Sequence, residues 1–252
     1  MEPPTDTAIA AYLRRSIIEG RDHERIGPFT ASFSRGSRNP FLNYAIPDDG
    51  AQPTPDDVAS LVDAYEAREL RPRLEYLPAI APDVERALLA AGFTVEGRLV
   101  LMVPGLPAGG LPPVDIELLI PSADDELRSL RTVQQEAYDD PEPITDASIA
   151  RLRANLRDGA GAILARTIDG GQPVGAGEFT CPIDGVSEIT SIAVREAWRR
   201  RGIAAALTTR LLEDARVAGV MTPFLMANEV ESRVYARVGF EPISEVLHIS
   251  RQ

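Results

Sequence analysis

The chain has 252 residues, of which 44% are hydrophobic and 25% charged, a composition that excludes general disorder. Its length suits two domains, since a domain commonly has about 100 to 150 residues. The formal net charge of −12 argues against nonspecific binding to nucleic acid or to a membrane surface, because both need a basic face.

The first part of the chain alternates helical and strand patterns and ends in a segment rich in proline and glycine. Thr54 is expected to cap a helix over 55–68, because it is followed by apolar residues at helical spacing. The segment 106–113 suits neither helix nor strand, so we predict a linker there between domains at 1–105 and 114–252. The other expected elements are helices over 7–19 and 82–90 and strands over 41–46, 73–77 and 98–103.

The second part predicts a longer regular series. Turns at Gly170-Gly171 and Asp184-Gly185 separate three strands that we expect to form an antiparallel meander. The element order is β-α-α-β-β-β-α-β-α-β, which predicts a mixed α/β (α+β) domain. In chain order the expected elements are 114–120, 124–137, 144–156 with Thr145 as cap, 162–167, 174–181, 187–194, 202–218, 224–227, 230–238 and 244–250.

The connection between the strand over 187–194 and the next helix has the character of an anion site. The first turn of a helix presents unpaired backbone N–H groups, and Gly202 with small residues after it allows a phosphate to approach them. Arg199, Arg200 and Arg201 would add countercharge, although a basic loop is often only solvated. The loop has neither the lysine of a P-loop nor a GxGxxG pattern, so nucleoside triphosphate and dinucleotide binding are disfavoured.

Two spaced motifs in this half resemble the Gcn5-related N-acetyltransferase (GNAT) family. Arg199-x-x-Gly202-x-Ala204 resembles the family's R/Q-x-x-G-x-G/A signature for acetyl-CoA, with alanine in place of the more frequent glycine. Asn228, Tyr235 and Gly239-Phe240 resemble its N-(x)6-Y-x-x-x-G-F pattern. The resemblance covers about 114–252 and implies a GNAT fold, a mixed sheet flanked by helices.

The resemblance also implies roles for individual residues. Tyr235 stands where the family places a general acid, whose phenol protonates the departing CoA thiolate. Asn228 would contact the cofactor arm, and no metal is expected. The remaining residues of the expected acetyl-CoA site are Ile192, Ala193 and Val194, whose backbone would pair with pantetheine, and Arg199, Arg200, Arg201, Gly202, Ile203, Ala204 and Ala205 around the pyrophosphate.

A general base is also expected, because an alkylammonium must lose its proton before it can attack a thioester. Glu178 and Glu188 lie on the two strands that line the acceptor cleft in the family, and we rank them nearly equally. Period-two alternation would put Glu188 on one strand face with Thr190, Ile192 and Val194. Either glutamate is as readily explained as an exposed strand residue, and His248 is a weaker candidate by residue type.

The first half resembles a degenerate copy of the second. When Gly92-Phe93 is aligned with Gly239-Phe240, Ala81 falls at the position of Asn228 and Leu88 at that of Tyr235. No acetyl-CoA signature occurs before residue 110. We therefore expect a tandem arrangement with an N-terminal GNAT-like unit that lacks cofactor and acid. The alternative is an unrelated α/β domain.

The sequence thus predicts an enzyme that transfers acetyl from acetyl-CoA to a primary amine of a small molecule or peptide by direct attack in a ternary complex. Alternatives are a different acyl group, or a GNAT-like sensor of CoA or an amine without turnover. The single cysteine, Cys181, is given no chemical role. We expect a cytoplasmic monomer, with the two units as an internal pseudo-dimer, or a homodimer. No nucleic acid partner is expected, because the net charge is −12. No membrane partner is expected either, since no stretch approaches the roughly 18 apolar residues of a membrane span.

Overall fold

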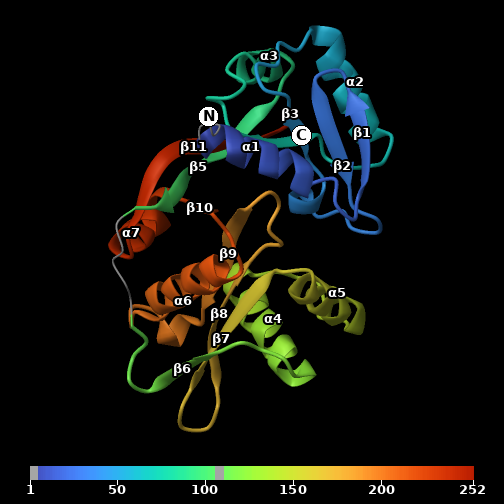
Figure 1. The fold of residues 1–252 in the computed structure, drawn as a ribbon. Helices are drawn as coiled ribbons and strands as arrows, with labels where there is room; N and C mark the ends of the chain where they lie inside the picture. Colours follow the sequence, from blue (N-terminus) through green and yellow to red (C-terminus); the bar gives the residue numbers. More distant parts are fainter. Residues whose placement is uncertain (1–4, 106–110) are drawn as a thin grey trace. The chain divides into compact units, whose positions relative to one another are not determined.

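The computed structural model describes residues 5–105 and 111–252 (Figure 1). The chain divides into two compact units, unit 1 with residues 1–101 and 243–252 and unit 2 with residues 102–242. The chain therefore crosses from one unit to the other within two strands, β5 (Thr94–Pro104) and β11 (Phe240–Ser250). Residues 106–110 of the predicted linker lie outside the described residues.

Unit 1 is a mixed sheet with helices, in the strand order β1-β2-β3-β4-β11-β5. The first three strands are antiparallel neighbours, β3 and β4 run parallel, and residues 247–250 of β11 pair antiparallel with β4. Its further elements are α1 (Thr5–Ser16), β1 (Asp22–Ile26), β2 (Phe29–Phe33), a 3-10 turn (Pro40–Leu42), β3 (Ala45–Pro47), α2 (Pro55–Glu66), β4 (Arg73–Tyr76) and α3 (Val84–Ala90).

The hairpin β1–β2 is the part of unit 1 that the sequence did not predict. Four of the five residues of β1 are exposed, and all four are charged or histidine, a pattern typical of an edge strand rather than of a half-buried one. The strand expected over 41–46 is also only partly correct, because a 3-10 turn occupies its beginning and β3 starts at Ala45. The expected helix over 55–68 is confirmed as α2, with Thr54 in a capping box with Asp57.

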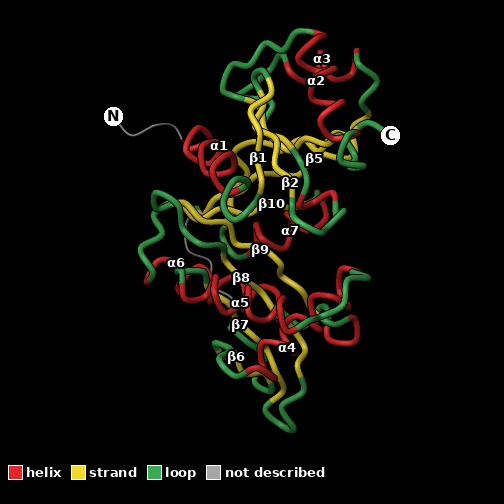
Figure 2. Tube along the Cα trace, turned by 90° about the vertical axis from the view of Figure 1, so that its right-hand side faces the viewer, coloured by secondary structure: helices red, strands yellow, loops and turns green. Residues whose placement is uncertain are grey.

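From β6 to α7, unit 2 follows the predicted order of elements, whereas the predicted last strand over 244–250 is the part of β11 that belongs to unit 1. The strands of unit 2 are ordered β10-β9-β8-β7-β6, antiparallel from β6 to β9 and parallel between β9 and β10. Figure 2 shows β7, β8 and β9 side by side. The elements are β6 (Ile116–Leu119), α4 (Asp124–Tyr138), α5 (Asp146–Arg157), β7 (Gly161–Thr167), β8 (Pro173–Phe179), β9 (Val186–Val194), a 3-10 turn (Glu196–Trp198), α6 (Ile203–Val217), β10 (Thr222–Ala227) and α7 (Glu229–Arg237).

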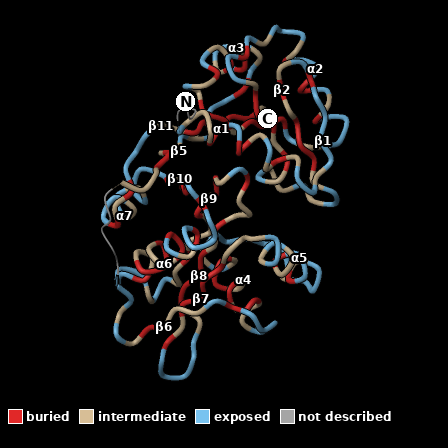
Figure 3. Tube along the Cα trace, in the orientation of Figure 1, coloured by how far each residue is buried: buried red, intermediate tan, exposed pale blue. Residues whose placement is uncertain are grey.

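Helices cover both faces of the unit 2 sheet. On one face, a buried apolar cluster joins α4 and α5 to β7, β8 and β9, including Ala176 and Ala193. On the other face, α6 lies so close to β8 that a Cβ at Gly175 would come within 2.9 Å of Ile203 and one at Gly177 within 2.8 Å of Leu211. The two glycines therefore permit the close packing that fixes the beginning of α6 beside the sheet. The buried strands between these layers are visible in Figure 3.

The two units share a series of elements, as the predicted duplication requires. Leaving the 3-10 turns aside, the order α1-β1-β2-β3-α2-β4-α3-β5 matches α5-β7-β8-β9-α6-β10-α7-β11. The strand directions match as well, since each series has an antiparallel meander followed by one parallel pair, β3–β4 or β9–β10. Ala81 and Leu88, which the predicted duplication aligns with Asn228 and Tyr235, are buried in the core of unit 1.

Candidate active site

The edge of β9 that faces β10 is partly unpaired. In the described residues the pairs between β9 and β10 end at Glu188 and Phe224, whereas β9 stays paired with β8 as far as Val194. The backbone of residues 192–194 therefore has β8 on one side and no strand partner from β10 on the other. An extended chain with amide groups can pair with such an edge, as in strand addition.

A bulge in β9 changes which side chains share a face. The register between β8 and β9 shifts after Ala176, and Ser191 has a positive φ of 56°. Thr190 pairs with Glu178 on the α4 side, but Ile192 lies against Gly177 on the α6 side, where a Cβ on that glycine would approach its Cδ1 to 2.6 Å. The prediction that Glu188 shares a face with Ile192 and Val194 is therefore wrong, because the bulge interrupts the alternation.

The beginning of α6 is open to an anion. Gly202 stands at the N-cap with φ 83° and has no side chain to occupy the N–H groups of the first turn, and that turn contains no acidic residue. Ala204 and Ala205 are small and half-buried, while Ile203 is buried against the sheet. Helix N-termini of this kind bind phosphates through backbone N–H groups and the helix dipole.

The three arginines before α6 have different partners. Arg199 donates from Nε to the Val194 carbonyl at 3.1 Å, and Arg201 pairs with Asp115 at 2.7 Å and lies over the Trp198 ring at 4.5 Å. Arg200 is exposed with a left-handed backbone at φ 64°, and its side chain has no partner in the part of the chain that the structure describes. Two of the cations are thus held in place beside the first turn of α6.

Asn228 and Tyr235 lie at the two ends of α7. Asn228 caps the helix, since its Oδ1 accepts from the amides of Val230 and Glu231 at 3.0 and 2.9 Å. The Tyr235 ring packs edge-on against Phe240 at 6.4 Å, and among the described residues its hydroxyl has no hydrogen-bond partner. Burial raises the pKa of Tyr235, with further contributions from Tyr138 and Glu231. The phenol is therefore protonated at neutral pH, as a proton donor must be.

The two candidate bases have different surroundings. The Glu178 carboxylate is largely buried and fully engaged, because it accepts from Arg131 at 2.8 Å and from Gln134 Nε2 at 2.7 Å. Glu188 is half-buried on β9, at the residue where pairing with β10 ends, and its amide donates to Thr180 Oγ1 at 2.9 Å. Glu178 is therefore held as an ion-pair partner of α4, whereas Glu188 stands where the two parallel strands separate.

Tyr138 is a residue of this site that sequence reasoning missed. Its hydroxyl donates to the Ile192 carbonyl at 3.0 Å, on the β9 segment assigned to the cofactor. Tyr138 is 55% exposed, and the pKa of its phenol is raised by partial burial and by the carboxylates of Glu231, Glu178 and Glu188. Tyr138 thus stands in electrostatic range of both candidate bases. No motif could have identified it, because the expected helix ended one residue earlier and only the packing of α4 on the sheet brings it here.

His248 does not join these residues. It lies in unit 1, where its Nδ1 is 3.2 Å from Arg73 Nη2, while all the other candidate residues lie in unit 2. Within residues 5–105 and 111–252, no group of three His, Cys, Asp or Glu side chains is arranged to hold a metal ion. No helix in those ranges is long and apolar enough to cross a membrane.

Comparisons with known proteins agree on one family and fold. The family model described as "Acetyltransferase (GNAT) family" matches residues 126–240. No curated protein matches the sequence. A GCN5-related N-acetyltransferase from Kribbella flavida has a similar structure, with a TM-score of 0.78 and 21% identity over 98% of this chain and 95% of that one.

Two further solved structures resemble most of the chain. A GCN5-related N-acetyltransferase from Sphaerobacter thermophilus has a TM-score of 0.70 and 17% identity, over 89% of this chain and 76% of that one. A tandem GNAT protein from the clavulanic acid biosynthesis pathway has a TM-score of 0.64 and 16% identity, over 88% and 77%. At these identities the likeness concerns the fold, and its extent over both units supports the tandem organisation.

Proposed function

Because residues 126–240 of the chain belong to the acetyltransferase (GNAT) family, we propose that the protein transfers acetyl from acetyl-CoA to a primary amine of a small molecule or peptide. The observation that carries the proposal is the combination of the open first turn of α6 with a β9 segment that, beyond Glu188, has no strand partner from β10. The β9 segment suits the two amides of a pantetheine arm, and the helix N-terminus suits the pyrophosphate to which that arm is joined.

The acetyl thioester supplies an activated carbonyl, and the residues of unit 2 would handle the protons. We place the base at Glu188, because it lies on β9 at the residue where pairing with β10 ends, while Glu178 forms an ion pair with Arg131 of α4. Glu188 would take a proton from the amine, directly or through one water. The amine nitrogen would bond to the acetyl carbon, the carbon–sulfur bond would break, and Tyr235 would protonate the thiolate. The second proton of the nitrogen would then pass to the Tyr235 phenolate. The products are an amide and free CoA.

Isothermal titration of acetyl-CoA and of CoA tests the cofactor site. We expect about micromolar binding to the wild type and its loss in the double variant Arg201→Glu, Gly202→Asp, because both changes put negative charge beside the first turn of α6. Arg151→Glu, an exposed change in α5, is the control and should bind normally. No binding by the wild type would sink the proposal.

A screen of amines with detection of the released thiol tests turnover. Release of CoA that depends on one class of primary amine would support the enzyme and name its acceptor. Binding of acetyl-CoA without thiol release on any amine, acid or alcohol would instead support a sensor. Faster release of CoA from propionyl-CoA or a longer acyl-CoA than from acetyl-CoA would change only the acyl group in the proposal and keep the transfer to an amine.

A further inference from the structure

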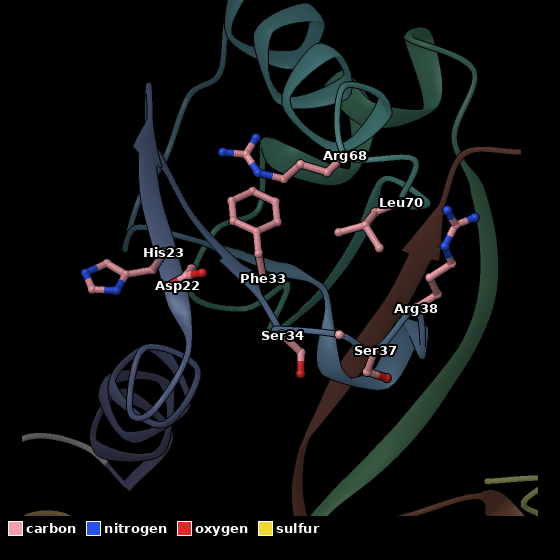
Figure 4. A pocket seen from close by; sticks show the side chains of 9 residues that line it. Asp22, His23, Phe33, Ser34, Ser37, Arg38, Arg68 and Leu70 are labelled. Atoms are coloured by element: carbon pink, nitrogen blue, oxygen red, sulfur yellow. The ribbon is translucent and has the colours of Figure 1, made fainter.

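Unit 1 contains a hollow that has no part in the proposed acyl transfer. Its volume is about 570 Å³, within the range of pockets that hold small molecules, and all its lining residues belong to unit 1. Figure 4 shows its walls: Asp22 of β1, Phe33 of β2, Ser34 and Arg38 of the following loop, and Arg68 and Leu70 of the connection from α2 to β4. The hollow thus has both apolar and charged walls.

The loop that forms one wall is held in a fixed shape. Asn43, which is buried, accepts from the Ser34 amide at 2.8 Å and donates to the carbonyls of Ser37 and Asn39 at 3.0 and 2.8 Å. One side chain therefore ties both ends of the loop. A wall held in this way costs little conformational entropy when a ligand binds.

Two of the charged side chains that line the hollow, Arg68 and Asp22, already have partners within unit 1. Arg68 lies 4.0 Å from the centre of the Phe33 ring and donates to Ala64 O at 2.7 Å and to Glu24 at 3.0 Å. The Asp22 carboxylate accepts from Arg35 on both oxygens. The Asp22 wall therefore offers little to a cationic ligand.

Arg38 differs from these groups because its partner can be replaced. It pairs with Glu69, and the two side chains are 73% and 74% exposed. An ion pair in such exposure contributes about 0 to 1 kcal/mol, so an anion that also makes other contacts can displace the glutamate. The guanidinium then offers two parallel N–H donors to a carboxylate or phosphate.

We propose that this hollow binds a small ligand that has an anionic head, carboxylate or phosphate, and an apolar body. The head pairs with Arg38 in place of Glu69, and the body lies mainly against Leu70, with Phe33 contributing only the small part of its ring that Arg68 leaves uncovered (Figure 4). The Ser34 hydroxyl, which has no partner among the described residues, offers the head one more hydrogen bond. The site is independent of the acyl transfer in unit 2, so its failure and the failure of the proposed function are separate outcomes.

Three probes with one apolar body test the proposal by isothermal titration into the full chain: phenylacetate, benzyl phosphate and 2-phenylethylamine. Binding of either anion with no binding of the amine supports the site, and the tighter anion identifies carboxylate or phosphate as the head. Equal binding of the amine, or no binding of either anion at millimolar concentration, overturns it.

Two variants with opposite expected effects locate the site. Arg38→Gln should weaken the affinity for the anion by about 10-fold or more, which is the usual contribution of a hydrogen bond to a charged group. Glu69→Gln should tighten it by about 2- to 5-fold, since it removes the competing carboxylate of an exposed pair. Glutamine should keep the left-handed backbone of residue 69, where φ is 55°, as well as glutamate does.

Arg86→Gln is the matched control, because Arg86 forms an exposed ion pair with Asp83 in the same unit but does not line the hollow. It should leave anion affinity unchanged. Equal weakening in Arg38→Gln and Arg86→Gln, or weaker binding in Glu69→Gln, would overturn the assignment to this hollow.

Discussion

Helices α2 and α6 hold the same position in the two repeated series, yet their first turns are opposite in character. At α2, Thr54 accepts from the Asp57 amide at 3.2 Å, the Asp57 carboxylate accepts from the Thr54 amide at 2.8 Å, and Asp56 adds a second acid. At α6, Gly202 provides no side-chain cap, and three arginines precede it. One helix satisfies its own N–H groups and repels anions, while the other leaves them for a ligand.

This difference is the one that the predicted tandem arrangement requires at single positions, because unit 1 is expected to lack both cofactor and acid. The fold of unit 1 keeps the strand directions, but the first turn of α2 is closed and Leu88 stands in the core where unit 2 has Tyr235. A side-chain cap such as Thr54 stabilises its helix by about 1 kcal/mol, and it occupies N–H groups that a phosphate would need. We expect acetyl-CoA chemistry in unit 2 alone.

The largest expected effect is that of removing the Tyr235 hydroxyl in unit 2, with removal of the Tyr76 hydroxyl in unit 1 as the control. Tyr235→Phe should lower kcat by about 10²- to 10⁴-fold, the usual contribution of a general acid, and leave acetyl-CoA affinity unchanged. Tyr76→Phe removes a buried hydroxyl of unit 1 that has no partner among the described residues, so it should leave kcat unchanged. Steady-state kinetics and titration on both variants make the comparison. Equal kcat values in wild type and Tyr235→Phe would show that the phenol does not donate the proton.

A second change makes the first turn of α6 resemble that of α2. Ala204→Asp adds a carboxylate to this turn, which should weaken acetyl-CoA by about 10- to 100-fold, because hydrogen bonds to the charged phosphate are worth about 1.5 to 3 kcal/mol. The acid should not destabilise the helix, since negative charge is favourable at its N-terminus. Ala204→Asn, of nearly the same shape, is the control and should lose much less affinity in the same titration. Comparable losses in both variants would point to shape rather than charge.

The sequence predicted the parts of this comparison that depend on local chemistry. The residue types of Thr54 and Gly202 are typical of helix N-termini and predicted where α2 and α6 begin. The two turns that contain glycine predicted the meander of unit 2. The bulge at Ser191 could not be predicted, because the pattern of apolar and polar residues in β9 before Ser191 is the same with or without a bulge there. The charged strand β1 was missed for a related reason, since its stability comes from pairing with β2 and not from a buried face.

The position of Tyr138 shows the same limit at the candidate site. Its hydrogen bond to Ile192 joins residues 54 positions apart, and it depends on how α4 packs across β8 and β9. The strong motifs located the candidate cofactor residues, while the surroundings of Glu178 and Glu188 required the structure. The predicted roles of these residues stay predictions until the variants are measured.

A third and smaller effect tests whether the Thr54 cap of α2 affects only stability and not acetyl-CoA binding. Thr54→Ala should lower the free energy of unfolding by about 0.5 to 2 kcal/mol, because it leaves a first-turn N–H without its partner. Thr145→Ala removes the equivalent cap of α5 in unit 2 and should cost a similar amount. Denaturant unfolding measures both losses, and acetyl-CoA titration should show one site of unchanged affinity. A second phosphate-dependent site in Thr54→Ala would contradict a purely structural role for the cap.

The smallest expected effect concerns a buried polar cluster of unit 1, where Arg73 contacts His248 and Glu75. Burial lowers the pKa of His248, and it outweighs the opposite influence of Glu75 and Glu96. The unfolded chain, with a histidine pKa of about 6.5, therefore binds a proton more readily than the folded one. This contribution to stability is complete above that pH and declines as the pH falls below it.

Thermal unfolding at pH 7.5 and 5.5 tests this dependence, because the chain has only two histidines. Tm of the wild type should fall more between the two pH values than Tm of His248→Gln, whose side chain does not titrate. His23→Gln alters an exposed residue of β1 and should behave as the wild type does. If His248→Gln and the wild type lost the same amount, the acid sensitivity would belong to carboxylates such as Glu96. Despite partial burial, the pKa of Glu96 is lowered by Arg73, which donates to its carboxylate at 2.8 Å. Carboxylates would then distinguish the two units in acid, because among the described residues only Arg73, in unit 1, is an arginine buried completely, and it pairs with Glu75 and Glu96.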